Sequence, residues 1–280
     1  MKKKIMMLMV TVLAAAFVTG CTGTAGASAT TEKSENSDTS LPDTANDNTF
    51  TVGFDANFPP YGYMDENGEF VGFDLDLAAE VASRNGWDII FQPIDWDSKD
   101  MELSSGTIDC IWNGFTMSED RLDKYEWSDP YVDNSQVFVV ASESGIKTQA
   151  DLSGKIVAVQ TDSSAQEALY SDDSKSLTDS FKELLVVPDY NTAFLNLEAG
   201  AVDAVAMDIG VANYQIAERN GGYEILEEVL VSEKYGVGFL KGNTELRDTV
   251  QKTLDEMASD GKFMEIADKW ELSDAVILGK

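Results

Sequence analysis

The residues best suited to binding chemistry lie between Asp109 and Tyr131. An apolar segment there is interrupted by Asn113-Gly114, where the lack of a side chain lets backbone amides approach a ligand closely. Thr116 follows as a hydroxyl donor, and Arg121 carries a planar guanidinium that donates two parallel hydrogen bonds. This combination indicates a grip on a carboxylate.

Arg121 lies in an acidic segment for which a short helical turn is expected, with Ser118 as its N-cap. We expect the arginine to turn back toward Gly114 and Thr116. The alternative is a surface arginine paired with its acidic neighbours Asp120 and Asp123.

Strands and helices alternate along the chain and must position these groups. Strands are expected at residues 50–54, 89–94, 108–112, 136–141, 156–160, 184–187, 204–207 and 235–239. Helices are expected at residues 74–85, 101–105, 165–170, 193–197, 246–258 and 263–270. The alternation predicts an α/β protein with mainly parallel sheets.

One pattern occurs twice. Residues 103–111 and 197–205 share spacing and character, each reading as a helix end, a glycine stop and a buried strand. In this register Asn113-Gly114 falls opposite Met207-Asp208. Because ligands of open α/β sheets bind at the carboxyl ends of strands, a ligand between two lobes could meet both Gly114 and Asp208.

Composition excludes several classes of function. The 280 residues include 50 acids, 20 bases and no histidine, a formal net charge of −30. Nucleic acid is therefore a poor partner, since phosphate binding needs a basic surface. Without histidine, histidine-based triads and most zinc sites are excluded, and we predict no cofactor or metal. Of the two cysteines, Cys110 reads as a small buried residue.

The amino terminus reads as a targeting segment. A basic start precedes an apolar run, residues 5–18, that is short for a membrane span. Residues 18–21 end in a cysteine after small residues and resemble a lipobox. We predict a lipoprotein signal peptide at 1–20, a lipidated Cys21, and a flexible tether over 21–48 that is too polar to fold. The alternative is an ordinary secretory signal.

The folded part resembles the extracellular solute-binding proteins of polar amino acid ATP-binding-cassette importers. The resemblance covers about Phe50 to Trp270. Its motifs are Asp55 with Phe58-Pro-Pro-Tyr61, Gly72-Phe-Asp-Leu-Asp-Leu77, Gly106-Thr-Ile-Asp109, Gly114-Phe-Thr-Met-Ser with Arg121, Trp127-Ser-Asp-Pro-Tyr131, Asp151-Leu-Ser-Gly-Lys155, Val157-Ala-Val-Gln160, Ala201-Val-Asp203 with Asp208, and Tyr235-Gly-Val-Gly-Phe with Lys241-Gly242.

The resemblance implies a two-lobed, type II periplasmic-binding-protein-like fold. Each lobe would be a mainly parallel sheet flanked by helices, and two hinge strands, near 136–141 and 232–236, would join them. Lobe 1 would comprise residues 49–137 and 235–280, and lobe 2 residues 138–234.

The same resemblance implies roles for single residues. Arg121 would clamp the α-carboxylate of an amino acid, and Asp208 would accept its α-ammonium. Gly114 and Thr116 would add an amide and a hydroxyl donor to the carboxylate. The remaining implied ligand-binding residues are Ser163 and Ser164 as donors of the second lobe, Phe58 and Trp96 as aromatic walls, and Asp55, Asn113, Phe115 and Gln160 as the pocket lining.

Several of these roles have structural alternatives. The serines could act as a helix N-cap, and the aromatic residues could be plain core. Asp162 stands where the resembled family often has glycine. Its carboxylate could repel an anionic ligand, reach a cationic or polar side chain, or point to solvent.

We expect capture of a free amino acid without catalysis, by a monomer that delivers it to the membrane permease of an ATP-binding-cassette importer. The expected location is the extracellular face of the cytoplasmic membrane. Polar, cationic and cystine-like ligands remain open. The alternatives are a dehydratase-type enzyme on the same fold, or a ligand-sensing module, for which a signalling domain or membrane span would be expected after Trp270.

Overall fold

The computed structural model describes residues 48–219 and 221–279. The predicted signal peptide, Cys21 and all of the tether before Asn48 lie outside the described residues. Among the helices that are described, none combines the length and the apolar character needed to cross a membrane.

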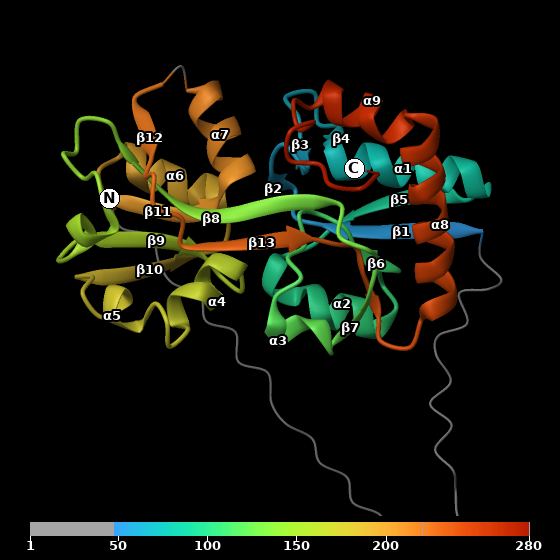
Figure 1. Cartoon of the computed structure of the whole chain (residues 1–280), viewed down its shortest axis with the longest axis horizontal. Helices are drawn as coiled ribbons and strands as arrows, with labels where there is room; N and C mark the ends of the chain where they lie inside the picture. The colour runs from blue at the N-terminus through green and yellow to red at the C-terminus, as the bar shows by residue number, and fades with distance from the viewer. Residues whose placement is uncertain (1–47, 220, 280) are drawn as a thin grey trace, which may run out of the picture. The chain divides into compact units, whose positions relative to one another are not determined.

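The first sheet carries the loop of Arg121, and we call the part of the molecule built on it lobe 1 (Figure 1). Its strand order is β5 (Asp88–Pro93), β1 (Thr49–Phe54), β6 (Cys110–Ile111), β14 (Gly238–Leu240) and β7 (Tyr125–Trp127). Its helical segments are α1 (Phe73–Asn85), η2 (Trp96–Ser98), α2 (Lys99–Ser105), α3 (Glu119–Leu122), α8 (Thr244–Asp260) and α9 (Lys262–Lys269).

The second sheet carries Asp208, and we call the part built on it lobe 2. Its strand order is β10 (Glu183–Val187), β9 (Ile156–Gln160), β11 (Ala204–Asp208), β8 (Val132–Ala141) and β12 (Tyr223–Ile225), with β13 (Val231–Tyr235) also paired to β8. Its helical segments are η3 (Gln149–Leu152), α4 (Ser164–Tyr170), α5 (Lys175–Thr178), α6 (Tyr190–Glu198) and α7 (Ile209–Glu218).

Two strands run from one lobe into the other. Strand β8 begins beside Val276 and Tyr235 and ends between β11 and β12, and β13 pairs antiparallel along its first half (Figure 1). These are the two expected hinge strands. The predicted lobe boundaries, after residues 137 and 234, fall inside them and stay a prediction.

A small third sheet is formed by β2 (Asn57–Phe58), β3 (Gly62–Met64) and β4 (Phe70–Val71). It was not predicted, because two- and three-residue strands give almost no periodic signal.

Two predictions about the strands were wrong. The sheets are mixed rather than mainly parallel, since β14 is antiparallel to β6 and β7, and β8 is antiparallel to β11, β12 and β13. Residues 235–239 do not form one strand. The chain passes from β13 to β14 at this point, and the N–H of Gly236 donates to the carbonyl of Phe115 at 3.0 Å.

Helix α1 ends at Asn85, as predicted, and α8 continues to Asp260, two residues beyond its predicted end. Gly86 after α1 and Gly261 after α8 have left-handed backbone, with φ of 71° and 86°, which glycine adopts without a Cβ clash. The lobes share a buried apolar core that includes Phe50 of β1, Val139 of β8 and Val205 of β11. Cys110 lies buried and free, as the sequence indicated.

Candidate ligand-binding site

Arg121 extends from α3 toward lobe 2. Its side chain is 7% exposed, and Nη2 lies 3.3 Å from Oε2 of Glu167 on α4. Nη2 also donates to the carbonyl oxygen of Asp162 at 3.2 Å, and the guanidinium lies 5.4 Å from the ring centre of Phe115. The ion pair of Arg121 is thus with Glu167 of the other lobe.

Ser118 stands at the N-cap position of α3, but its side chain does not cap the helix. The hydroxyl instead donates to Oε1 of Glu167 at 2.9 Å. The capping prediction was therefore wrong about the side chain, because an acceptor from lobe 2 lies within its reach.

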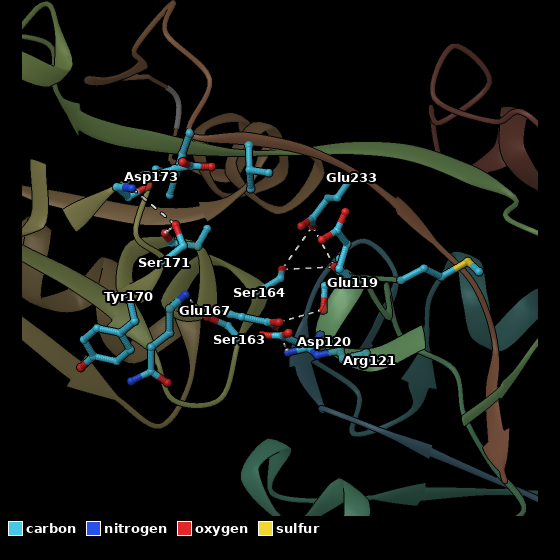
Figure 2. Close-up of a pocket in the computed structure, with 18 of the residues that line it drawn as sticks. Glu119, Asp120, Arg121, Ser163, Ser164, Glu167, Tyr170, Ser171, Asp173 and Glu233 are labelled. Carbon is cyan, nitrogen blue, oxygen red and sulfur yellow. Dashed lines mark hydrogen bonds and ion pairs between the residues drawn. The ribbon is translucent and has the colours of Figure 1, made fainter. Parts of the chain in front are cut away.

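A cavity of about 890 Å³ lies beside Arg121 and has walls from both lobes. Lobe 1 contributes Thr116 and Arg121, and α4 with its preceding residue contributes Ser163 and Ser164. Glu233 of β13 lines the same cavity (Figure 2). A guanidinium suited to a carboxylate and carboxyl groups suited to a cation therefore line one space.

Asp208 ends β11 and is 3% exposed. Its Oδ1 accepts hydrogen bonds from Asn134 Nδ2 at 2.7 Å, Gln136 Nε2 at 2.6 Å and the Tyr235 hydroxyl at 2.5 Å. Burial raises the pKa of Asp208 above its usual range, against the lowering effect of these three donors.

Glu233 is a binding-site candidate that sequence reasoning missed. Its Oε1 accepts from Thr116 Oγ1 at 2.8 Å, Ser164 Oγ at 3.2 Å, and both Asn134 Nδ2 and Gln136 Nε2 at 2.7 Å. Burial raises the pKa of Glu233 to about 7, and the charge of Asp208 adds to the effect. The sequence signal that could have identified Glu233 was its position as a charged residue within the hinge strand expected near 232–236.

The two serines of lobe 2 do different things. Ser163 is the N-cap of α4, accepting from the N–H of Gln166 at 3.1 Å and donating to the carbonyl of Gln160 at 2.8 Å. Ser164 Oγ accepts from the Thr116 hydroxyl at 3.1 Å, and it lies next to Glu233. The Ser163 side chain is thus occupied by the cap.

The chain matches the family described as bacterial extracellular solute-binding proteins, family 3, over residues 50–273. The chain belongs to this family. It is 31% identical over 223 residues to the L-cystine-binding protein TcyA of Bacillus subtilis, covering 79% of this chain and 80% of the relative.

Solved structures agree with the fold. A substrate-binding protein of an ABC uptake transporter from Streptococcus pneumoniae, with bound histidine, is 34% identical with a TM-score of 0.79, covering 82% of this chain and 94% of the other. An ancestral amino acid-binding protein, AncCDT-1, a precursor of cyclohexadienyl dehydratase, is 30% identical with a TM-score of 0.72, covering 80% and 95%.

In this solute-binding protein the predicted aromatic walls are buried. Phe58 is 6% exposed and packs on Tyr61 and Tyr190, while Trp96 is 8% exposed and meets Phe115 edge-on, 5.6 Å between ring centres. Trp96 also lines a second cavity of about 540 Å³ together with Asp55. Phe58 and Phe115, although predicted to line the pocket, lie in neither of these two linings.

Four other predicted residues also lie outside the linings of the two cavities: Asn113, Gly114, Gln160 and Asp208. The N–H of Gly114 was expected to donate to a ligand, but it donates to Asp74 Oδ2 at 2.6 Å. Asn113 Oδ1 accepts from the N–H of Asp55 at 3.1 Å.

Residues predicted to bind a ligand from opposite lobes contact each other directly. Gln160 Nε2 of lobe 2 donates to Asp55 Oδ2 of lobe 1 at 2.7 Å. Burial raises the pKa of Asp55 to about 6. Thr116 and Ser164 form a second such contact. The two lobes therefore meet through polar side chains that were predicted to bind a ligand.

Asp162 takes one of the options left open by the sequence. Its carboxylate pairs with Lys99 Nζ of lobe 1, whose side chain is 2% exposed and lies 5.3 Å from the ring centre of Trp96. Burial lowers the pKa of Lys99, against the raising effect of Asp162. Sequence reasoning missed Lys99, because a lysine at a helix start carries no sign of burial.

Proposed function

We propose that this solute-binding protein captures a free polar amino acid, or a closely related zwitterion, between its two lobes and delivers it to the permease of an ATP-binding-cassette importer. The observation that supports this most is that a guanidinium and a buried carboxyl group line the same cavity. Arg121 lines the large cavity from lobe 1, and Asp208 is tied to Glu233 of the same cavity through shared amide donors. A zwitterion needs one partner of each sign.

Binding and closure would be one event. Arg121 belongs to lobe 1 and Asp208 to lobe 2, so a ligand that engages both stabilises the closed arrangement over an open one. Exclusion of water strengthens both pairings. The ligand would take the place of Glu167 as the partner of Arg121, since a bidentate carboxylate is the better match for the guanidinium.

The finer parts of the proposal concern the rest of the chain. We assign residues 49–137 and 235–280 to lobe 1 and 138–234 to lobe 2. A signal peptide over 1–20 and lipidation of Cys21 would hold the monomeric protein on the extracellular face of the cytoplasmic membrane through the tether 21–48. Two hydrophobic signals are needed for stable anchoring, which a diacylated cysteine provides.

A thermal-shift screen of the protein against the free L-amino acids, cystine included, tests the function. A ligand at a thousand times its dissociation constant stabilises the folded state by about 4 kcal/mol, which the melting temperature reports. We expect one amino acid or a small related group to raise it. A screen in which none does so would contradict the proposal.

The dehydratase alternative is supported by the likeness to AncCDT-1 and by carboxyl groups with raised pKa values in the site. Incubation with prephenate or arogenate, followed by chromatography of the products, separates the two functions. We expect no turnover. Dehydrated product that requires the intact protein would favour the enzyme.

A further inference from the structure

Four polar side chains lie on one face of three neighbouring strands. In the antiparallel register Asp208 of β11 stands opposite Gln136 of β8, and Glu233 of β13 stands opposite Asn134 of β8. Asn134 and Gln136 are two residues apart on one strand, so they point to the same face. The hinge strands therefore bring two carboxyl groups to a pair of amides.

Both amides donate to both carboxyl groups. Asn134 Nδ2 lies 2.7 Å from Asp208 Oδ1 and 2.7 Å from Glu233 Oε1, and Gln136 Nε2 lies 2.6 Å and 2.7 Å from the same two atoms. Two carboxylate oxygens that share donors in this way are close neighbours. If both were ionised, their repulsion would be strong in a buried site.

The cluster has more acceptors than donors. The amide oxygens, Asn134 Oδ1 and Gln136 Oε1, are buried, and neither has a hydrogen-bond partner in the described part of the chain. Within residues 48–219 and 221–279, no lysine or arginine forms an ion pair with Asp208 or Glu233. Buried carboxylates and amide oxygens are stabilised by a donor-rich cation.

Three tyrosines also face the pair. They are Tyr61 from the loop before β3, Tyr190 at the start of α6 and Tyr235 at the end of β13. Burial raises the pKa of each well above 10, so all three are neutral around pH 7. The charge of the cluster near neutral pH thus depends on Asp208 and Glu233.

Glu233 is placed to reach a ligand. It lines the cavity of Arg121, whereas Asp208 does not, and its carboxylate accepts from Thr116 of lobe 1 and Ser164 of lobe 2. A group that binds between the lobes and carries a positive charge would meet Glu233 first.

We propose that Glu233 is a second ligand-binding carboxyl group, which joins Asp208 in one acceptor site for the α-ammonium of the bound amino acid. The proposal rests on the proposed amino acid-binding function. In the free protein the pair holds one proton between the two carboxyl groups. When the ammonium enters, that proton leaves to solvent, and one positive charge replaces another.

Proton release on binding makes the affinity depend on pH in a defined direction. Binding that releases a proton becomes tighter as the pH rises through the pKa of the releasing group, which for Glu233 is about 7. Affinity for the amino acid should therefore rise between pH 6 and pH 8. The substitution E233Q removes the ionisable group and retains its shape, so this rise should disappear.

Calorimetric titration tests the proposal, with the free L-amino acids of the thermal-shift screen as probes, L-arginine, L-histidine, L-glutamine and L-cystine among them. At pH 7 in phosphate and in Tris, the wild-type binding heat should differ between buffers, because the released proton is taken up by the buffer. For E233Q the heats should agree, and affinity at pH 8 should fall roughly tenfold or more.

The matched control is Asp133→Asn. Asp133 lies on the same hinge strand as Asn134, its side chain is 59% exposed, and it faces Lys234 at 4.0 Å. This variant removes a carboxylate from the same strand pair on the other face. It should keep the wild-type affinity and the wild-type dependence on buffer.

A measurement on the free protein tests the carboxyl pair separately. In protein labelled with ¹³C at the glutamate side-chain carboxyl, the resonance lost in E233Q should titrate near pH 7 and shift to lower pH in Asp208→Asn. Titration of Glu233 in the ordinary glutamate range would overturn the pair.

The outcomes separate the two proposals. A wild-type protein that binds no free amino acid overturns the proposed function and this inference with it. A wild-type protein that binds an amino acid with no proton release, and an E233Q variant that binds it equally well, overturn this inference alone.

Discussion

The segments 103–114 and 197–208 build the same unit in the two lobes and end it differently. In each, a helix stops at a glycine with left-handed backbone, Gly106 at φ 76° and Gly200 at φ 68°. An aspartate follows whose Oδ2 accepts the N–H of the adjacent strand, Asp109 from Thr51 at 2.7 Å and Asp203 from Ile156 at 2.8 Å. The echo seen in the sequence is thus a shared structural unit.

The difference begins where the strands end. After β6 the chain forms a loop through Thr116 to Arg121, and it presents a cation that is paired across the lobes. After β11 it enters α7 directly at Asp208, whose carboxyl group is buried among donors. The repeated unit supports the strands in both lobes. The residues that follow it differ, and they supply Arg121 in lobe 1 and Asp208 in lobe 2.

The largest expected effect follows from removing either charge. Arg121→Ala should weaken amino acid binding by about 2–5 kcal/mol, because it leaves a buried carboxylate without its partner. Asp208→Asn should also weaken binding, because it removes the charged acceptor of the α-ammonium. Arg121→Lys should bind poorly as well, since lysine lacks the planar guanidinium fork. Calorimetry measures all three.

Arg84→Ala is the matched control for these variants. Arg84 pairs with Glu80 and Asp260 on the surface of α1 and α8, so its removal should leave affinity unchanged. Unchanged affinity in Arg121→Ala would remove the carboxylate clamp from lobe 1.

The next largest effect is on the free energy of unfolding and concerns two buried carboxyl groups, those of Asp74 and Glu233. Burial raises the pKa of Asp74 in lobe 1 to about 7 and that of Glu233 on the hinge to about 7. The folded state then holds protons that the unfolded state has released. The stability of the ligand-free protein should therefore fall as the pH rises from about 4 to about 7, by on the order of 2–4 kcal/mol for Asp74.

Urea unfolding at pH 5 and pH 7.5 measures this slope. Asp74→Asn should remove the part of this pH dependence that comes from Asp74. E233Q should remove the part that comes from Glu233. Stability that rises over the same interval would show that these carboxyl groups are ionised in the folded protein at pH 5.

A smaller effect tests the shared unit itself. Asp109→Ala and Asp203→Ala should each lower the free energy of unfolding by about 1 kcal/mol, because each leaves a strand N–H without its acceptor. Binding should not change in either. The double variant should lose about the sum, since the two aspartates support strands of different sheets. A large effect of one alone would show that the two units are not equivalent.

The smallest effect concerns the cross-lobe ion pair. Glu167 is 29% exposed and lies 3.3 Å from Arg121, where it competes with a ligand carboxylate. Glu167→Gln should tighten amino acid binding by about 0.5 kcal/mol, a factor of two or three, as for other partly exposed pairs. Weaker binding in this variant would mean that Glu167 orients the guanidinium rather than competing for it.

Much of the fold was accessible from sequence because its signals are local. The helix stops at Gly86 and Gly261, the strand at 156–160 and the repeated helix–glycine–strand unit all follow from residues within one segment. The short strands β2 and β3 pair with each other within one segment but are too short to give a periodic signal, whereas β7 and β14 pair with each other across a long stretch of chain. No local pattern encodes such pairings.

For the site, the sequence by itself determined which groups are present: a guanidinium after a glycine-broken strand, an aspartate at the end of the matching strand, and a resemblance that implied opposite roles for them. The tertiary structure decided how these groups are engaged. It gave Arg121 a partner in Glu167, gave the Gly114 amide to Asp74, and buried Lys99 against Asp162. It also placed Glu233 beside Asp208. The reason is that hydrogen bonds and pKa values depend on distance and burial, which arise when strands distant in sequence pair side by side.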